Sequence, residues 1–208
     1  MSVTQLRLGV LGSGKGSNFV AIADAIRVGT VPAELAVVIS DVESAGILEH
    51  ARTLGIPSRY LAPGRFRTKL DEVSEPGYIA LLREARVNLV VLAGFMRILK
   101  GEFLRVFEGR VINIHPSLLP AFPGLEAWKQ ALDYGAKVAG CTVHLVDQGI
   151  DTGPILAQRA VPVLDGDSPA TLHERIQGVE RELYPQVIAA FARGEITVQG
   201  RVTRGFHR

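Results

Sequence analysis

The sequence predicts an α/β fold, in which a doubly wound, mostly parallel open sheet forms a single domain over residues 1–208. Short apolar runs alternate along the chain with longer helical stretches, the pattern typical of parallel α/β proteins. A length of 208 residues suits one domain, and a hydrophobic content of 47% is sufficient for a sizeable core. Glycines follow the first apolar run at once, as in many open α/β sheets.

Strands and helices are expected to alternate through the first third of the chain. Leu6–Leu11 predicts a strand that ends at glycines, and Ser17–Val28 predicts a helix. The β-branched run Glu34–Ser40 predicts the second strand, and a helix over Glu43–Leu54 ends before a glycine. A short strand is expected near Ser58–Leu61.

The middle of the chain begins with a predicted loop. Charges, a proline and a glycine indicate this loop over Arg65–Gly77, leading into a helix over Tyr78–Ala85. Asn88–Ala93 is apolar on both faces, which favours a central parallel strand. A short helix over Gly101–Phe107 and a strand over Val111–His115 follow.

The residue pattern in the last third of the chain predicts two helices and two strands. Gly124–Tyr134 is expected to be helical, and Val138–Val146 alternates like a half-buried strand. Ile155–Val163 predicts a further strand, and a long amphipathic helix is expected over Ser168–Ala192.

Composition excludes several classes of protein. The 23 Lys and Arg against 21 Asp and Glu give a net charge of +2, which argues against a strongly basic nucleic-acid binder. The single cysteine predicts no internal disulfide and favours a reducing, cytoplasmic location. No apolar run is long enough for a membrane helix, and the N-terminal segment does not resemble a signal peptide. The five histidines lack metal-ligand spacing, so no metal site is expected.

The glycine-rich segment 9–17 reads GVLGSGKGS and predicts an anion site. It nearly matches a P-loop, but Gly16 occupies the position of the metal-binding hydroxyl. It also nearly matches a dinucleotide fingerprint, with Ser17 in place of the third glycine. In either case the backbone N–H groups and the positive end of the helix dipole favour an anion. We therefore expect one phosphate group here, without a metal ion.

The segment 111–115, VINIH, predicts an oxyanion site. Alternation along a strand places Asn113 and His115 on one face, where an amide and an imidazole can both donate to one carbonyl oxygen. A carboxylate nearby would favour the imidazolium form, and Asp147 and Asp151 are the candidates. His144 either faces Asn113 or is structural, and we expect the structural role.

Five segments carry a resemblance to a known family: SGKGSN (13–18), VVLAGFMRIL (90–99), INIHPSLLPAFPG (112–124), GCTVHLVDQGIDTGPIL (140–156) and GDSPATLHERIQGVERELYP (166–185). The chain resembles phosphoribosylglycinamide formyltransferases, folate-dependent enzymes of purine biosynthesis with a Rossmann-like fold. Methionyl-tRNA formyltransferases carry an additional C-terminal domain, and formyltetrahydrofolate hydrolases an N-terminal regulatory domain. Because the chain starts at the first strand and ends soon after the long helix, we expect the glycinamide enzyme.

The resemblance implies roles for individual residues. The catalytic set is Asn113, His115 and Asp151. The substrate's phosphate is held by Gly16, Ser17 and Asn18, and its ribose is contacted by Glu180. The folate is contacted by Met96, Arg97, Ile98, Leu99 and Asn113, by the loop Asp147, Gln148, Gly149, Ile150 and Asp151, and by Lys69, where some relatives have arginine. Residues 1–100 then form a phosphate-binding half and residues 101–208 a folate-binding and catalytic half.

The implied reaction moves a formyl group from 10-formyltetrahydrofolate to the amine of phosphoribosylglycinamide, without a covalent enzyme intermediate. Asn113 and protonated His115 would stabilise the tetrahedral oxyanion, and either a bound water or Asp151 would carry the proton. Cys141 is expected to be an inert core thiol. The partners expected are these small molecules, with no nucleic acid or membrane, in a monomer or homodimer. A cis peptide bond is also expected before Pro120, because the SLLP turn must fold back over the site.

Three alternatives remain open at the level of sequence. The first is a formyltetrahydrofolate hydrolase or another folate-dependent formyltransferase. The second is an NAD-dependent oxidoreductase that uses the glycine segment together with Asp41, which follows the second strand. The third is a non-catalytic module that binds a nucleotide or folate, which would have no need of a charged oxyanion donor.

Overall fold

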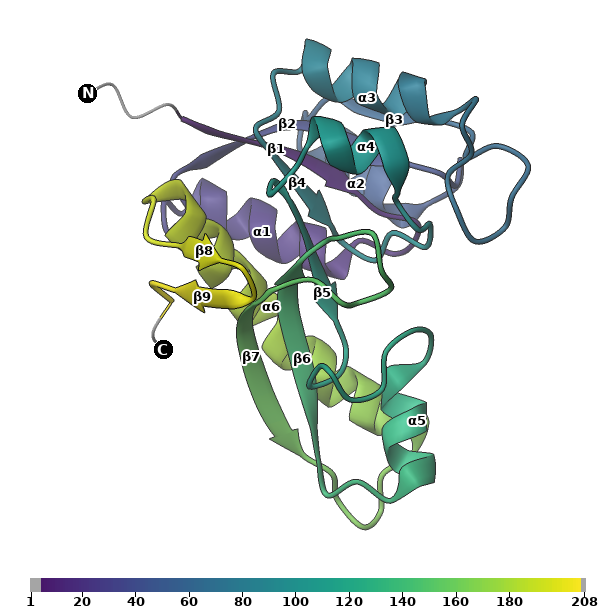
Figure 1. The fold of residues 1–208 in the computed structure, drawn as a ribbon, viewed down its shortest axis with the longest axis vertical. Helices are drawn as coiled ribbons and strands as arrows, with labels where there is room; N and C mark the ends of the chain where they lie inside the picture. The colour runs from purple at the N-terminus through teal and green to yellow at the C-terminus, as the bar shows by residue number, and fades with distance from the viewer. Residues whose placement is uncertain (1–4, 207–208) are drawn as a thin grey trace. The chain divides into compact units, whose positions relative to one another are not determined.

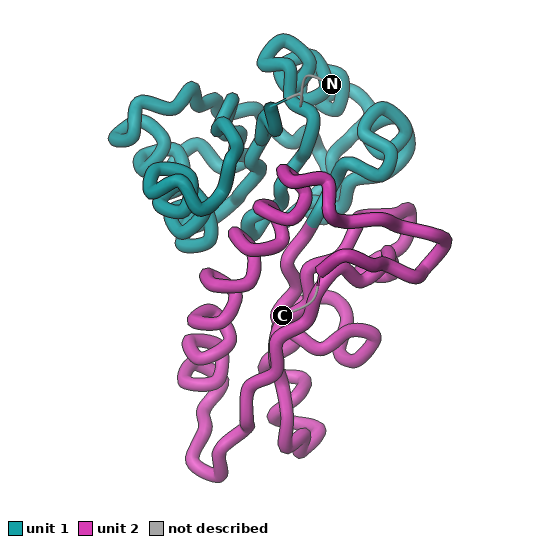
Figure 2. Tube along the Cα trace, turned by 90° about the vertical axis from the view of Figure 1, so that its left-hand side faces the viewer, with its two compact units in different colours: residues 1–112 teal, residues 113–208 magenta. Residues whose placement is uncertain are grey.

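The computed structural model describes residues 5–206, and the chain divides into two compact units, residues 1–112 and residues 113–208 (Figure 2). The strands are β1 (Leu6–Leu11), β2 (Ala33–Ser40), β3 (Ser58–Tyr60), β4 (Leu89–Leu92), β5 (Val111–His115), β6 (Val138–Leu145), β7 (Ile155–Pro162), β8 (Thr197–Gln199) and β9 (Val202–Arg204). The helices are α1 (Ser17–Arg27), α2 (Gly46–Thr53), α3 (Glu75–Glu84), α4 (Gly101–Val106), α5 (Ala127–Tyr134) and α6 (Pro169–Ala192) (Figure 1).

The strands confirm the predicted α/β fold with a mostly parallel sheet. Among the described residues, one seven-stranded sheet has the order β3-β2-β1-β4-β5-β6-β7. β1 pairs in parallel with β2 and with β4, and β2 pairs in parallel with β3. β6 and β7 are antiparallel, as two consecutive strands joined by a loop can be. Strand order reverses next to β1, so the segment after β1 lies where open α/β sheets usually bind ligands.

In the first unit, the buried strands β1, β2 and β4 bring the end of β1 close to its neighbours. The N–H of Gly12 donates to Ile39 O at 3.1 Å, and that of Ser13 donates to Gly94 O at 3.0 Å. A Cβ at Gly12 would lie 2.9 Å from Ala93 O, so this close approach of backbones requires glycine. The glycine segment is therefore attached to both neighbouring strands.

Three helices begin at other residues than predicted. α2 starts at Gly46 rather than Glu43, because Ala45 before it has an extended conformation, with φ −64° and ψ 132°. α3 starts at Glu75, inside the predicted loop, because Asp71 Oδ1 accepts the backbone N–H groups of Val73 and Ser74 and so stabilises the turn that leads into it. α5 starts at Ala127 rather than Gly124, because Glu126 adopts φ 52°, outside the helical region.

In unit 113–208 one further prediction was wrong, and one element was not predicted. β6 is buried along nearly its whole length rather than half-buried, and α6 packs against both β6 and β7 (Figure 1). The chain also continues after α6 into the hairpin β8–β9, where β9 packs against β7. This hairpin was not predicted because its two strands have only three residues each and are mostly exposed.

The turn that follows β5 is held by the buried hydroxyl of Thr142 on β6. Thr142 Oγ1 donates to Ser117 O at 2.6 Å and accepts the N–H of Leu119 at 3.0 Å. The amide of Gln158 on β7 donates to the same hydroxyl at 3.0 Å. The Leu119–Pro120 peptide bond is cis, which confirms the prediction made for this turn.

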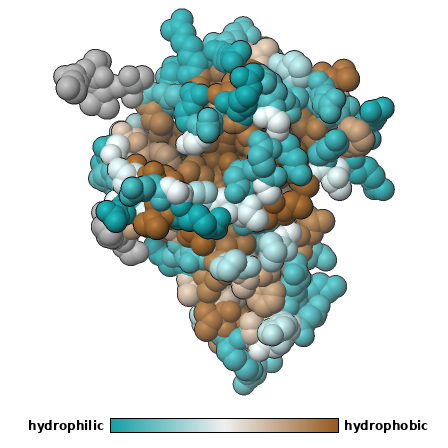
Figure 3. Space-filling view, viewed as in Figure 1, coloured by the Kyte–Doolittle hydropathy of each residue, from teal (hydrophilic) through white to brown (hydrophobic). Residues whose placement is uncertain are grey.

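Outside the core, hydrophilic and hydrophobic side chains are interspersed on the face drawn in Figure 3. Large apolar side chains that are strongly exposed include Val73, Leu125 and Tyr134. Within residues 5–206, the helices are too short or too polar to cross a membrane.

We expect Thr142→Val to destabilise the fold by about 1–3 kcal/mol, because it leaves the carbonyl of Ser117 and the N–H of Leu119 buried without their partner. Urea unfolding of the variant and the wild type measures this difference. Thr53→Val is the matched control, because its hydroxyl bonds Glu49 O at an exposed position. An equal, small effect of both substitutions would contradict the role assigned to Thr142.

Candidate active site

Four side chains of residues 113–208 form one connected group, which we call the polar cluster: Asn113, His115, His144 and Asp151. Asn113 and His115 lie on β5, His144 lies on β6, and Asp151 lies in the loop that follows β6. Asn113 Nδ2 is 3.2 Å from His144 Nε2, which in turn is 3.7 Å from Asp151 Oδ1. Asp151 Oδ2 is 3.4 Å from His115 Nδ1. The structure thus brings together the three residues that the sequence suggested, and adds His144.

His144 determines how the amide of Asn113 is oriented. Its Nδ1 is 2.8 Å from the carbonyl oxygen of Leu145, which only accepts, so Nδ1 carries the hydrogen. Burial of His144, which is 2% exposed, lowers its pKa from 6.5, an effect that the Leu145 carbonyl and Asp151 oppose. Neutral His144 therefore accepts at Nε2 from Asn113 Nδ2, which leaves the second N–H of Asn113 to donate elsewhere.

His115 has an acceptor at each ring nitrogen. Nε2 is 2.9 Å from the carbonyl oxygen of Phe122, and Nδ1 faces Asp151 Oδ2. A carbonyl and a carboxylate only accept hydrogen bonds, so each ring nitrogen of His115 faces an acceptor. The ring is 5% exposed, so little water competes for these contacts.

The Asp151 loop has a conformation that its own side chains stabilise. Asp151 adopts φ 54°, a left-handed conformation that aspartate tolerates better than most residues, and its Oδ2 accepts the N–H of Gly124 at 2.8 Å. Asp147 Oδ1 accepts from the N–H of Gly149 at 3.1 Å and from Thr152 Oγ1 at 2.6 Å. Asp151 is therefore the carboxylate beside His115, whereas Asp147 shapes the loop.

The C-terminal hairpin β8–β9 holds the far end of the Asp151 loop. Arg201 Nη1 donates to Thr152 O at 2.9 Å, and Thr203 Oγ1 donates to Ile155 O at 2.6 Å. The tip of the loop is exposed and consists of Gln148, Gly149 and Ile150. The loop is thus anchored at its base and open to solvent at its tip, as suits a segment that contacts a ligand.

Glu180 and Cys141 are neighbours inside unit 113–208. Glu180 lies on α6 and is 5% exposed. Burial raises the pKa of the Cys141 thiol to about 12, and the charge of Glu180 adds to this effect. A thiol with this pKa stays protonated at neutral pH and is a poor nucleophile, in line with the prediction of an inert cysteine.

In residues 1–112, the glycine turn, which we define as residues 12–18, leads directly into α1. Gly16 precedes the first helical residue, Ser17, and adopts φ 83°. A Cβ at Gly16 would also lie 2.9 Å from the Cα of Ile47, so both backbone conformation and space require glycine here. The N-terminal turn of α1, which includes Asn18, and exposed Lys15 form a positive region of the kind that binds anions.

The segment Met96–Leu99 follows β4, and Lys69 lies beside it. Lys69 and Ile98 form an isolated parallel bridge, in which the N–H of Ile98 donates to Thr68 O at 2.9 Å. Met96 is 57% exposed and Leu99 is buried. The structure therefore brings together two parts of the predicted folate site that are separated by more than twenty residues of chain.

The side chain of Arg97 is directed to Asp41. Arg97 Nε is 2.7 Å from Asp41 Oδ2, and Ser13 Oγ is 2.5 Å from Asp41 Oδ1. Both carboxylate oxygens of Asp41 are therefore engaged in internal bonds. This observation argues against the NAD-dependent interpretation, in which Asp41 would accept from a ribose hydroxyl.

The sequence analysis named His144 and Asp41, but it did not predict the contacts that the structure gives them. His144 was interpreted as structural because β6 is apolar on either side of it, and only its partner on β5 reveals its contact with Asn113. The contact between Asp41 and Arg97 joins residues 56 positions apart, for which a single sequence contains no signal.

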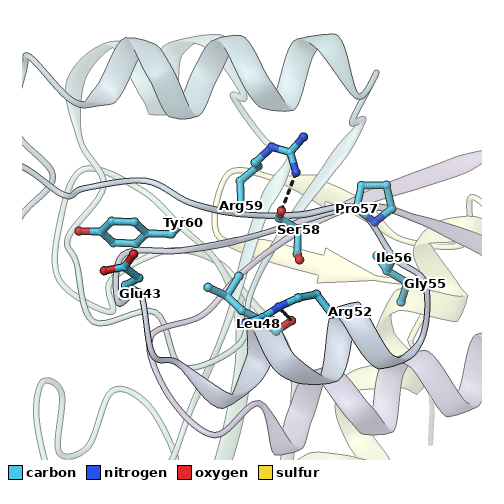
Figure 4. Close-up of a pocket in the computed structure, with 9 residues that line it drawn as sticks. All are labelled: Glu43, Leu48, Arg52, Gly55, Ile56, Pro57, Ser58, Arg59 and Tyr60. Carbon is cyan, nitrogen blue, oxygen red and sulfur yellow. Dashed lines mark hydrogen bonds between the residues drawn. The ribbon is translucent and has the colours of Figure 1, made fainter.

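A surface cavity of about 550 Å³ lies elsewhere in unit 1–112, between α2 and β3 (Figure 4). Glu43 and Tyr60 lie at one end of it, and Gly55, Ile56 and Pro57 lie at the other. None of the predicted site residues lines this cavity. Among residues 5–206 there is no group of three or more histidine, cysteine or acidic side chains that could hold a metal ion, and His207 lies outside the described residues.

Proteins of similar sequence provide evidence about the family of this chain. The protein from Drosophila pseudoobscura pseudoobscura named trifunctional purine biosynthetic protein adenosine-3 is 47% identical over 94% of this chain, which spans only 14% of that protein's length. Phosphoribosylglycinamide formyltransferase from Mycobacterium tuberculosis (strain H37Rv) is 46% identical over 94% of this chain and 89% of its own length.

Solved structures that resemble this chain come from proteins with related names. Glycinamide ribonucleotide transformylase 1 from Symbiobacterium toebii superposes with a TM-score of 0.92 at 46% identity, over 98% of this chain and 95% of that one. A formyltetrahydrofolate deformylase from Pseudomonas syringae pv. tomato superposes with a TM-score of 0.90 at 25% identity, over 99% and 67%. The family model described as formyl transferase matches residues 6–188. The chain therefore belongs to the formyl transferase family.

Proposed function

We propose that the protein transfers a formyl group from 10-formyltetrahydrofolate to the primary amine of phosphoribosylglycinamide, in purine biosynthesis. The observation that carries this proposal is the polar cluster, in which His144 holds the amide of Asn113 and the Asp151 carboxylate lies beside the rings of both His144 and His115. In the reaction the amine nitrogen bonds to the formyl carbon, the bond from that carbon to N10 breaks, and one proton moves from the amine to N10. The carbonyl oxygen carries negative charge in between.

Asn113 supplies a neutral hydrogen bond to this developing oxyanion. Since one N–H of its amide is directed to His144 Nε2, the orientation of the amide is set before the substrate arrives. A donor that needs no reorientation during the reaction is the feature by which oxyanion sites accelerate acyl transfer.

His115 supplies a charged hydrogen bond, and Asp151 keeps it charged and oriented. In the described geometry the Nε2–H of His115 faces the Phe122 carbonyl. An alkoxide is a much stronger acceptor than a peptide carbonyl, so the bond would pass from Phe122 O to the oxyanion as charge develops. Asp151 Oδ2 also accepts from Gly124, which fixes the carboxylate when the ring shifts. Asp151 or a bound water carries the proton to N10.

Two segments of residues 1–112 hold the substrates in this proposal. The glycine turn, through Gly16, Ser17 and Asn18, holds the phosphate of phosphoribosylglycinamide. The folate lies along Met96–Leu99, with Lys69 near its anionic end. In residues 113–208 the loop Asp147–Asp151 covers the pteridine and Glu180 accepts from the ribose. No metal takes part in these steps.

Hydrolysis of 10-formyltetrahydrofolate is the second candidate, because the chain also superposes on a formyltetrahydrofolate deformylase. The two functions differ only in whether water or the amine attacks the formyl carbon. A spectrophotometric assay of 10-formyltetrahydrofolate consumption, with and without phosphoribosylglycinamide, separates them. Consumption that depends on the amine supports the transferase, and consumption without it would identify a hydrolase. If 10-formyltetrahydrofolate is not consumed in either case, a non-catalytic binding module would be the remaining interpretation.

We expect His115→Ala, Asn113→Ala and Asp151→Asn each to lower turnover by about 10²–10³-fold, because each removes or misdirects an oxyanion donor. The losses should not add, since the three groups act as a unit. Steady-state kinetics of the folded variants measure these effects. Asp133→Asn, an exposed change on α5, is the control for Asp151→Asn. Near wild-type turnover of Asp151→Asn would remove this carboxylate from the mechanism.

The buried, neutral state of His144 predicts a stability that depends on pH. Its pKa in the folded protein lies below the unfolded value of 6.5, so the unfolded chain binds the proton more readily. The stabilisation is therefore present above pH 6.5 and is lost as the pH falls through the folded pKa. Urea unfolding at about pH 7.5 and about pH 5.5 should show a larger acid-induced loss for wild type than for His144→Gln. Exposed His50→Gln is the control, and equal losses for His144→Gln and wild type would contradict the prediction.

Cys141→Ala should retain turnover close to that of the wild type, because the buried, protonated thiol takes no part in a direct transfer. Steady-state assays measure the turnover. Mass spectrometry of the enzyme during turnover provides the complementary test, and a formyl group trapped on Cys141 would refute direct transfer.

A further inference from the structure

We propose that Asp41 is a positioning residue that couples the glycine turn to the segment Met96–Leu99, so that each substrate binds more tightly when the other is present. This inference rests on the proposed function, in which the glycine turn holds the phosphate and Met96–Leu99 contacts the folate. Asp41 touches neither substrate in this proposal and acts through Ser13 and Arg97.

Ser13 forms the link from Asp41 to both segments. Its hydroxyl donates to Asp41 Oδ1 at 2.5 Å and accepts the backbone N–H of Met96 at 2.8 Å. Ser13 belongs to the glycine turn, and its own N–H donates to Gly94 O at 3.0 Å. One hydroxyl therefore joins the carboxylate, the glycine turn and the start of the folate segment.

Arg97 extends the same connection to the loop 61–74 between β3 and α3, which contains Lys69. Its Nε donates to Asp41 Oδ2 at 2.7 Å, and its Nη1 donates to the carbonyl oxygens of Phe66, at 2.9 Å, and Arg67. The loop is further joined to the segment by the bridge between Lys69 and Ile98. Asp41 thus lies between three pieces of chain that would each contact a substrate.

Burial makes this contact an effective link. The Asp41 side chain is 1% exposed and the Arg97 side chain 17%, so water does not readily replace either partner. A buried charge that loses its partner is strongly unfavourable, so separation of Asp41 from Arg97 is costly. Displacement of the glycine turn would therefore disturb Met96 through Ser13. Displacement of Arg97 would disturb Asp41 and, through it, Ser13 and the glycine turn.

Coupled order of this kind has a thermodynamic consequence for binding. A ligand that orders the glycine turn also orders Met96–Leu99, and a second ligand then meets a segment that has already lost its freedom. The coupling is reciprocal, so each ligand should raise the affinity for the other by the same factor. Energetic coupling between two sites typically amounts to about 5- to 150-fold in affinity.

Titration calorimetry with phosphoribosylglycinamide and tetrahydrofolate tests the inference. Tetrahydrofolate carries no formyl group, so no turnover disturbs the measurement. The dissociation constant of each ligand is determined alone and in the presence of the other, for wild type, Asp41→Asn and Ser13→Ala. Asp24→Asn, on the exposed part of α1, is the matched control.

We expect coupling of at least about fivefold in the wild type and in Asp24→Asn, and coupling close to one in Asp41→Asn and Ser13→Ala. If Asp41 and Ser13 had only a structural role, the substitutions would lower thermal stability or the affinity for both ligands. For each ligand, the ratio of the dissociation constants measured without and with the other ligand would stay unchanged. Ser13→Ala keeps the contact between Asp41 and Arg97, and therefore decides the matter if Asp41→Asn does not fold.

Unchanged coupling in Ser13→Ala, or independent binding of the two ligands in the wild type, would overturn the inference while leaving the proposed function intact. A wild-type protein that binds neither ligand would instead contradict the proposed function, and the inference with it.

Discussion

The contact of the Asp151 carboxylate with His115 is the interaction on which the geometry of the polar cluster depends. His115 is buried, and the Asp151 carboxylate lies 3.4 Å from its Nδ1. The carboxylate must itself be held, and the backbone of Gly124 does this from the loop after β5. The left-handed conformation of Asp151, the folded turn after β5 and the anchored end of the Asp151 loop all serve to keep this one contact in place.

Buried polar groups in this protein are arranged so that each constrains another. His144 is kept neutral by burial and thereby orients Asn113, and Asp41 is satisfied by Ser13 and Arg97 and thereby joins two segments of residues 1–112. Networks of this kind specify one arrangement, because every alternative leaves a buried donor or acceptor without a partner. Such pre-organisation is what both catalysis and coupled binding require.

Much of the fold follows from local pattern. The strands β1, β2, β4 and β5 lie within a residue or two of their expected bounds, because continuous apolar runs of this length suit buried parallel strands. The starts of α2, α3 and α5 were misplaced, since they depend on the local conformation of the chain at Ala45, Asp71 and Glu126. The hairpin β8–β9 carries too little apolar pattern to be recognised.

The sequence alone determined the type of chemistry. An amide and an imidazole two residues apart on a strand, a glycine turn before a helix, and the order of the family motifs were sufficient to identify a formyl transferase. The residue pattern alone left Asp147 and Asp151 open, and the family resemblance pointed to Asp151. Only the tertiary structure showed that Asp151 lies beside His115, that His144 contacts Asn113, and that the Arg97 side chain is directed to Asp41. The reason is physical. Each of these contacts forms between polar side chains from distant segments, which are buried together when the chain folds and must then bond to one another. A single sequence does not show which distant segments come together.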